Sequence, residues 1–168
     1  MNEGVPLIWI DCEMTGLNLP TDALIEVAVL VTDDQLTPVG DGVEVVIKPP
    51  ASALAQMSDF VRQMHTESGL LPLLDTGTTL SRAEEIILEY LEKSGVPPGK
   101  APLAGNSLWL DRNFIARDLP KVNQFIHYRS VDVSSIKELA KRWFPKAYFA
   151  APEKSGNHRA LGDVRDSI

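Results

Sequence analysis

Two carboxylates, Asp11 and Glu13, directly follow an apolar run that has the sequence LIWI. Side chains along a strand alternate between its two faces, so both carboxylates are expected on the same side. Two neighbouring anions on one face of an apolar strand repel each other and are costly to desolvate. A bound divalent cation removes that cost, and the pair therefore predicts one half of a metal site.

Additional ligands are expected elsewhere in the chain, because a hard divalent ion takes more oxygen ligands than two side chains supply. Asp111 falls within the apolar stripe of a helix expected near residues 107–118, where a carboxylate needs a partner. Asp163 lies on the final expected helix, five residues after His158. A neutral imidazole at His158, with a reference pKa of about 6.5, is suited to take a proton from metal-bound water.

The chemistry of these donors predicts the kind of metal. Four carboxylates and one histidine, with no cysteine ligand, favour Mg²⁺ or Mn²⁺ over structural zinc. Four carboxylates are enough to hold two ions about 3.5–4 Å apart, the arrangement used for displacement at a phosphodiester. We therefore expect a two-metal hydrolytic site in which His158 is the general base.

The elements that must position these residues change in character along the chain. Residues 6–10, 23–32 and 43–48 have the composition of strands joined by short turns, which predicts an antiparallel meander. Strands and helices then alternate. The later strands are expected at residues 102–104 and 128–131, and the helices at 53–66, 79–94, 107–118, 134–143 and from 158 onward, with a loop at 145–157. This order predicts an α/β sandwich with a mixed sheet.

Length and composition limit the class of protein. A chain of 168 residues, 44% hydrophobic and 23% charged, is expected to form one domain over residues 1–168. The net charge of −7 argues against a protein that coats long duplex nucleic acid, but it permits a nuclease with a local pocket for a short substrate.

Several features bear on the location of the protein. No apolar run approaches the roughly 18 residues needed to cross a bilayer, and the first residues lack the features of a signal peptide. The single cysteine, Cys12, suits a reducing compartment, so we expect a cytoplasmic protein with no membrane partner. The final helix reaches Ile168 without a stop signal, which suggests that it is cut short there.

The order Asp11-x-Glu13, Asp111 and His158-x-x-x-x-Asp163 resembles the DEDDh exonucleases, and within them the oligoribonucleases. The stretches WIDCEMTGL, AGNSLWLDRNF, HYRSVDVSSIKELAKRW and NHRALGDVRDS carry this resemblance over nearly the whole chain. It implies a ribonuclease H-like α/β/α sandwich whose mixed sheet has five strands, the first three antiparallel. It also implies a homodimer that degrades very short RNA, especially dinucleotides, from the 3′ end to 5′-mononucleotides.

The same resemblance implies roles in substrate binding at matching positions. Leu17 and Phe60 would wedge against the bases. The 5′-phosphate would be capped by Ser107, Arg129 and Ser134, and this cap would restrict the enzyme to short substrates. Arg129 also makes physical sense as a phosphate clamp, because a guanidinium forms charge-assisted hydrogen bonds with phosphate oxygens.

Two more positions are implied to complete the site. His65 would lie beside the bound substrate, and Tyr128 would act in catalysis from the partner subunit. Tyr128 has a simpler interpretation as a strand aromatic that packs on a helix.

Two alternatives remain open at this point. A related DEDDh exonuclease that trims tRNA ends or proofreads DNA would need an open groove for long strands, whereas the stretch HYRSVDVSS favours a closed pocket. A module that captures short nucleotides without cleaving them would be expected to lack an acidic ligand or His158, and all five residues are present.

Overall fold

The computed structural model describes residues 4–152 and 159–168, and its centre is a five-stranded mixed sheet in the order β3-β2-β1-β4-β5. The strands are β1 (Leu7–Met14), β2 (Leu24–Thr32), β3 (Pro38–Val46), β4 (Pro102–Gly105) and β5 (His127–Asp132). β1 and β3 both pair antiparallel to β2, while β4 runs parallel to β1 and to β5. The expected mixed sheet with three antiparallel leading strands is confirmed.

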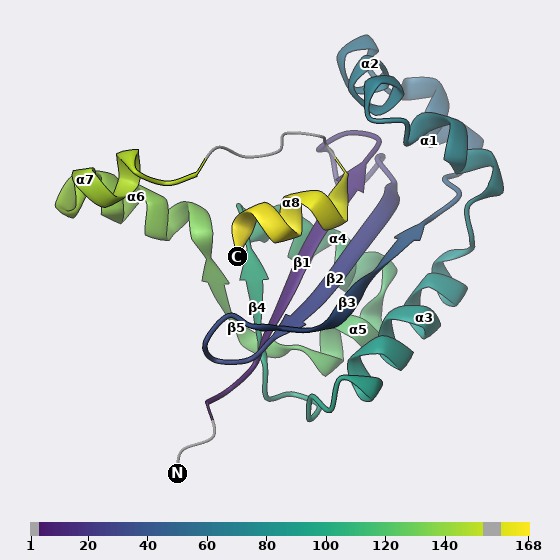
Figure 1. Ribbon diagram of the computed structural model, residues 1–168. Helices are drawn as coiled ribbons and strands as arrows, with labels where there is room; N and C mark the ends of the chain where they lie inside the picture. The colour runs from purple at the N-terminus through teal and green to yellow at the C-terminus, as the bar shows by residue number, and fades with distance from the viewer. Residues whose placement is uncertain (1–3, 153–158) are drawn as a thin grey trace.

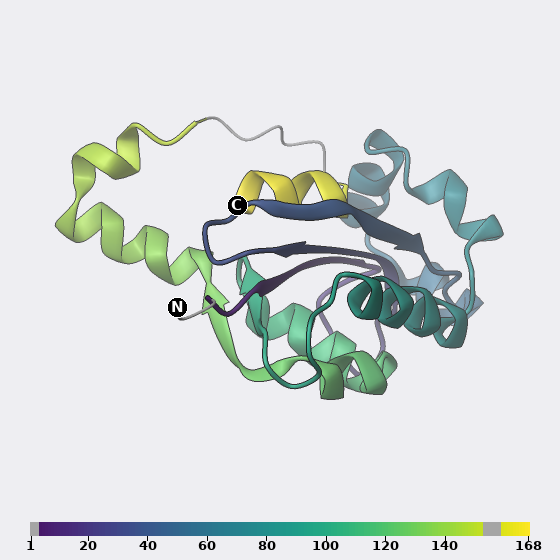
Figure 2. The same cartoon turned by 60° about the horizontal axis from the view of Figure 1, so that its bottom comes forward.

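Helices cover both faces of this sheet (Figure 1). The α-helices are α1 (Ala51–Gln56), α2 (Asp59–Glu67), α3 (Leu80–Lys93), α4 (Leu108–Asp118), α5 (Pro120–Phe125), α6 (Val133–Trp143), α7 (Pro145–Phe149) and α8 (Ala160–Ser167), and a 3-10 helix spans Leu71–Thr76. Figure 2 shows α8 on one face and α3, α4 and α5 on the other. Helices α6 and α7 extend outward beyond β5, away from both layers. No helix in the described part of the chain is long and apolar enough to span a bilayer.

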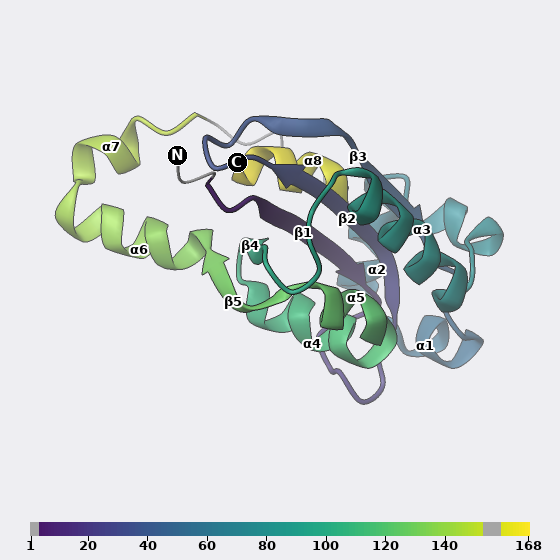
Figure 3. The ribbon, with the colours of Figure 1, turned by 90° about the horizontal axis from the view of Figure 1, so that it is seen from below.

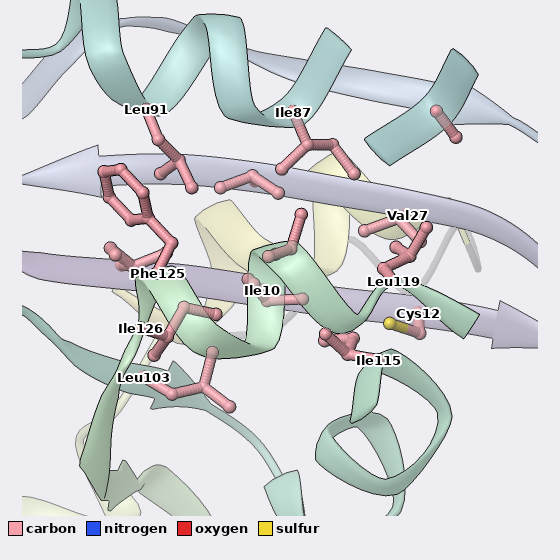
Figure 4. Packing of buried hydrophobic residues seen from close by; sticks show 14 of the residues in the cluster. Ile10, Cys12, Val27, Ile87, Leu91, Leu103, Ile115, Leu119, Phe125 and Ile126 are labelled. Carbon is pink, nitrogen blue, oxygen red and sulfur yellow. The ribbon is translucent and has the colours of Figure 1, made fainter. Parts of the chain in front are cut away.

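The faces of β1 are distinguished by alternate side chains. Ile10 and Cys12 belong to the large apolar cluster formed with α3, α4 and α5 (Figure 4), whereas Trp9 belongs to a smaller cluster with α8. By strand alternation Asp11 and Glu13 share the face of Trp9. The sheet therefore directs both carboxylates toward α8, and it directs Cys12 into the core.

The structure extends or divides several expected elements. β1 does not end at residue 10 but continues through the carboxylates to Met14, because its pairing with β2 continues through Glu13 and Glu26 to the pair Met14 and Leu24. The helix expected at residues 53–66 is two helices, α1 and α2. Ser58 interrupts it as the N-cap of α2, where its side chain accepts a hydrogen bond from Val61 N at 3.3 Å.

The segment expected to be a loop at residues 145–157 begins with a short helix, α7. Pro145 occupies the first turn of α7, and Pro120 occupies the first turn of α5, which the sequence analysis did not anticipate. Proline is favoured there because its fixed φ suits the helix and its missing N–H is not needed. The expectation that Pro145 belongs to a loop was wrong.

Candidate active site

Three of the four predicted metal ligands meet between β1 and α8. Asp11 and Glu13 project from β1 and Asp163 projects from the first turn of α8, and one ligand oxygen of each lies within 4.8 Å of the others. All three side chains are partly buried. The arrangement gathers three carboxylate oxygen donors in one small region. Carboxylate oxygens are the ligands that Mg²⁺ and Mn²⁺ prefer.

Asp111, the fourth predicted ligand, lies beside this cluster. It is buried in the first turn of α4, and its Oδ1 accepts a hydrogen bond from Cys12 N at 2.9 Å. Cys12 is the residue between the two carboxylates of β1, so Asp111 reaches the strand at the level of the cluster. Close approach of the preceding turn requires Gly105, because a Cβ there would lie 2.7 Å from Ile10 O.

Burial and mutual repulsion change the acidity of the cluster. Burial, followed by the charges of Asp11 and Asp163, raises the pKa of Glu13 to about 8. Burial likewise raises the pKa of Asp111 to about 6, against the hydrogen bond from Cys12 N that lowers it. A bound cation stabilises the ionised form of carboxyl groups whose pKa is raised in this way. The donor set therefore fits a divalent metal.

His65 supports the end of β1 from helix α2. Its side chain is fully buried, and Nε2 lies 2.9 Å from Met14 O. A carbonyl oxygen only accepts, so Nε2 carries the proton of this hydrogen bond. Nδ1 then faces Glu13 Oε2 at 4.0 Å. The structure thus brings His65 to the cluster, in contact with the strand that carries two of its carboxylates.

His158, the predicted general base, lies outside the described residues. The residue that follows it, Arg159, is the N-cap of α8. Asp163 N donates to Arg159 O at 3.0 Å, which closes the first turn of the helix.

Leu17 and Phe60 are both strongly exposed, at 73% and 78% respectively, although they are large apolar side chains. Leu17 lies in the turn between β1 and β2. Asp22 orders this turn by accepting hydrogen bonds from Asn18 N and from the Thr15 hydroxyl, both at 2.9 Å. An exposed aromatic ring such as that of Phe60 is suited to stacking on a nucleotide base, and an exposed aliphatic side chain such as that of Leu17 is suited to apolar contact with one.

Arg117 fixes the same turn from α4. Its guanidinium donates to Leu19 O and, at 3.0 Å, to Asp22 O. The turn that presents Leu17 is therefore attached to the helix that carries Asp111.

Ser107 and Ser134 are adjacent, as the predicted phosphate cap requires. Their hydroxyl oxygens lie 3.0 Å apart, and Ser107 N donates to Ser134 Oγ at 2.9 Å. Asp132, which the sequence analysis missed, organises the pair by accepting hydrogen bonds from Ser107 N, Leu108 N and Ser134 N. The signal for Asp132 was available, since aspartate directly before a helix is a preferred N-cap.

Tyr128 and Arg129 are exposed on the edge strand β5. The guanidinium of Arg129 lies over the Tyr128 ring, 5.5 Å from its centroid. In the described part of the chain, no hydrogen bond joins the Arg129 side chain to Ser107 or Ser134. Within one chain the two serine hydroxyls are in contact, and the Arg129 guanidinium lies over the Tyr128 ring.

A family model described as RNase_T exonuclease matches residues 8–168. The chain belongs to the exonuclease family. Curated relatives within it carry the name oligoribonuclease, and three of them come from Streptomyces griseus, Cutibacterium acnes and Mycobacterium leprae. The first is 60% identical over 96% of this chain and 81% of its own length. The other two are 58% and 53% identical over 96% of this chain, and 80% and 76% of their own lengths. The expected membership of the oligoribonuclease group is confirmed.

Solved structures of exonuclease family members support the fold. The zinc-bound complex of E. coli exonuclease I with single-stranded DNA superposes with a TM-score of 0.72 at 15% identity, and it covers 98% of this chain. Exonuclease I from Methylocaldum szegediense superposes with a TM-score of 0.63 at 21% identity. This chain spans 39% and 38% of those two proteins, so the similarity concerns the exonuclease fold alone.

Proposed function

We propose that this chain is a metal-dependent 3′-to-5′ exoribonuclease that degrades very short RNA, especially dinucleotides, to 5′-mononucleotides. The observation that carries the proposal is the meeting of Asp11, Glu13 and Asp163 within 4.8 Å, in a chain 60% identical to an oligoribonuclease. Residues 1–168 are taken to form one exonuclease domain, and the single cysteine supports a cytoplasmic location.

The acidic cluster would hold Mg²⁺ or Mn²⁺, and with Asp111 it offers enough carboxylate oxygens for two ions. Such ions, when bound, lower the pKa of water and stabilise a leaving oxygen. The carboxylates of Asp11, Glu13 and Asp163 supply the negative charge that holds cations at this point. Asp111 is kept at the level of the cluster by its hydrogen bond from Cys12 N.

Proton transfer is assigned to His158, which precedes α8 in the sequence. In the sequence it directly precedes Arg159, the N-cap of the helix whose first turn contains Asp163. Its neutral imidazole would take the proton from the attacking water, as its ordinary pKa allows near neutral pH.

The substrate would lie between the exposed apolar side chains and the serine pair. Leu17 and Phe60 would contact the bases, and His65 would keep the end of β1 in place beside them. The hydroxyls of Ser107 and Ser134 are 3.0 Å apart and would both donate to the 5′-phosphate. Their amide groups already bind Asp132, so the hydroxyl groups are the donors that are left for a ligand.

A homodimer would complete the phosphate cap. Helices α6 and α7 extend from β5, away from the rest of the fold (Figure 3). The segment that contains them has large apolar side chains that are exposed in a single chain. Those side chains are Ile136, Leu139, Trp143, Phe144 and Phe149. Exposed apolar patches of this kind mark protein interfaces. A second copy packed there would carry its own Tyr128 and Arg129, which lie just before α6, toward the neighbouring site.

The deciding experiment compares initial rates with Mg²⁺ on a 5′-labelled dinucleotide and on RNA of about twenty nucleotides. Rapid cleavage of the dinucleotide and slow attack on the long RNA are expected, because a capped 5′-phosphate leaves no path for a longer strand. Asp11→Asn provides the control for contaminating nucleases. The reverse preference would favour an exonuclease that trims tRNA or proofreads DNA, and would contradict the capped pocket.

A further inference from the structure

Arg159 joins α8 to two strands of the sheet. Its Nη2 and Nε donate to Glu26 Oε1 on β2 at 2.7 and 3.1 Å. Nη2 also donates to Glu44 Oε2 on β3 at 3.1 Å. Glu26 is fully buried, and a buried carboxylate is stable only when it is paired. The planar guanidinium is suited to this pairing because it presents several donors in a fixed geometry.

The same two carboxylates bind the first backbone amides of α8. Ala160 N donates to Glu26 Oε2 at 3.1 Å, and Leu161 N donates to Glu44 Oε1 at 3.0 Å. The N-cap residue Arg159 makes no side-chain capping bond, so two strands provide the capping that a local serine or aspartate usually gives. Carboxylates are also favoured here by the helix dipole.

This anchor lies next to the metal ligands. Glu13 and Glu26 are directly opposite each other in the register of β1 and β2. Asp163 belongs to the first turn of α8, the turn whose N–H groups the anchor holds. A shift of this turn would therefore move Asp163 relative to the carboxylates of β1.

Few side chains of α8 are fully buried against the sheet. The helix has eight residues, and its buried members are Ala160 and Val164. Isolated helices of this length are not stable in water. At the opposite end, Arg165 Nη2 donates to Asp41 O at 2.9 Å, and Asn106 Nδ2 donates to Ser167 Oγ at 2.7 Å.

We propose that Arg159, Glu26 and Glu44 are positioning residues that hold α8 so that Asp163 meets Asp11 and Glu13. The inference rests on the proposed metal site, and it concerns the protein before substrate binds. If Arg159 acted only through its charge, its replacement would change the strength of metal binding in the opposite direction. Removal of a cation near Glu13 would by itself strengthen metal binding, whereas loss of positioning weakens it.

Arg159→Met separates these two effects, with Mn²⁺ as the probe. The metal-free protein is titrated with Mn²⁺, and the electron paramagnetic resonance signal reports the free ion. We expect binding about 10- to 100-fold weaker than in the unsubstituted chain, the range found when residues that orient metal ligands are changed. Hydrogen exchange of the α8 amides, measured without metal, is expected to become faster.

Arg165→Met is the matched control, because it removes the same charge from an exposed position on the same helix. It should bind Mn²⁺ as the unsubstituted chain does, and the first turn of α8 should exchange at the unchanged rate. Mn²⁺ binding by Arg159→Met as tight as or tighter than that of the unsubstituted chain, with unchanged exchange in α8, would overturn the proposal.

Glu44→Gln keeps the test decisive if Arg159→Met does not fold, because Glu44 is partly exposed and its replacement leaves Glu26 paired. A folded protein with faster α8 exchange and weaker Mn²⁺ binding is expected, and unchanged exchange would contradict the anchor. An unsubstituted chain that binds no Mn²⁺ would refute the metal site itself. The exchange comparison without metal would still decide whether the anchor holds α8.

Discussion

The centre of the sheet and its β5 edge differ in how far a single chain buries their apolar side chains. At the centre, every residue of β2 is buried, and β1 and α8 pack beside it. At the β5 edge, α6 and α7 contain no buried residue. Trp143, Phe144 and Phe149 are each about two thirds or more exposed, at 66%, 66% and 76%. At the centre, packing and hydrogen bonds within the chain hold the carboxylates in place. At the β5 edge, the described residues of the chain leave an apolar surface exposed.

This difference separates two parts of the proposed reaction. Metal would bind between β1 and α8, which one chain orders by itself. The 5′-phosphate would be recognised where the serine pair, Tyr128 and Arg129 lie, and there we expect a second chain to contribute.

Asp163→Asn should have the largest effect, confined to the central region. Loss of a charged metal ligand is expected to cost about 4 kcal/mol or more of transition-state stabilisation, roughly a 10³-fold fall in kcat on a dinucleotide. Thermal unfolding of the metal-free protein should occur at the same temperature or higher, because one of three repelling carboxylates becomes neutral. Retention of more than a tenth of the activity would contradict the assignment of Asp163.

The acidity of Glu13 gives a second test of the central region. Burial and Asp11 raise its pKa from 4.5 to about 8 in the fold, so between these pH values the folded state keeps a proton that the unfolded state has lost. The free energy of unfolding of the metal-free protein should therefore fall as pH rises from about 4.5 to about 8, on the order of a few kcal/mol in total.

Urea unfolding in the presence of a chelator, repeated over this pH range, measures the effect. Glu13→Gln should reduce the slope, because glutamine does not titrate. Equal slopes in the two proteins would show that Glu13 ionises normally in the fold. Self-association should not change with pH through this residue, since Glu13 belongs to the carboxylate cluster of β1 and α8, whereas the exposed apolar side chains belong to the segment of α6 and α7.

Much of the central region could be predicted from the sequence, because its signals are local. Strand alternation places Asp11 and Glu13 on one face and Cys12 on the other, as the structure shows. The continuation of β1 to Met14 could not be read locally, since it depends on pairing with β2. The break between α1 and α2 could have been inferred from Ser58, a favourable N-cap in the middle of the expected helix.

The supporting contacts of the site were harder to predict. Glu26 stands within the apolar sequence LIEVAVLVT, and a charge in such a strand signals a buried pair. The identity of its partner required the fold, because Arg159 is 133 residues away.

Trp143→Asp should break the proposed contact between chains and leave the central region intact. A charge in an apolar interface that buries a tryptophan is expected to cost about 2 kcal/mol or more in association, roughly a 30-fold weaker dimer. Sedimentation equilibrium measures the change, and Mn²⁺ binding should stay as it is in the unsubstituted chain. Leu36→Asp, in the exposed turn between β2 and β3, is the control for an added charge. Unchanged association in Trp143→Asp would remove α6 and α7 as the interface.

Arg129→Ala, with the smallest expected effect, tests whether the two regions work together. If Arg129 binds the 5′-phosphate, its loss should slow cleavage of a 5′-phosphorylated dinucleotide by about tenfold, since a charge-assisted hydrogen bond is worth about 1.5 kcal/mol or more. Cleavage of a dinucleotide without the phosphate should change little. An equal loss on both substrates would contradict the phosphate cap.

The decisive version combines Arg129→Ala with Trp143→Asp in a double-mutant cycle. If Arg129 acts in the site of its own chain, Arg129→Ala would slow cleavage equally in a monomer and in a dimer. An Arg129 that reaches the partner's site has nothing to act on in a monomer, so its substitution should have no further effect once Trp143→Asp has separated the chains. The coupling energy between these two substitutions therefore shows whether Arg129 of one chain contributes to the active site of its partner.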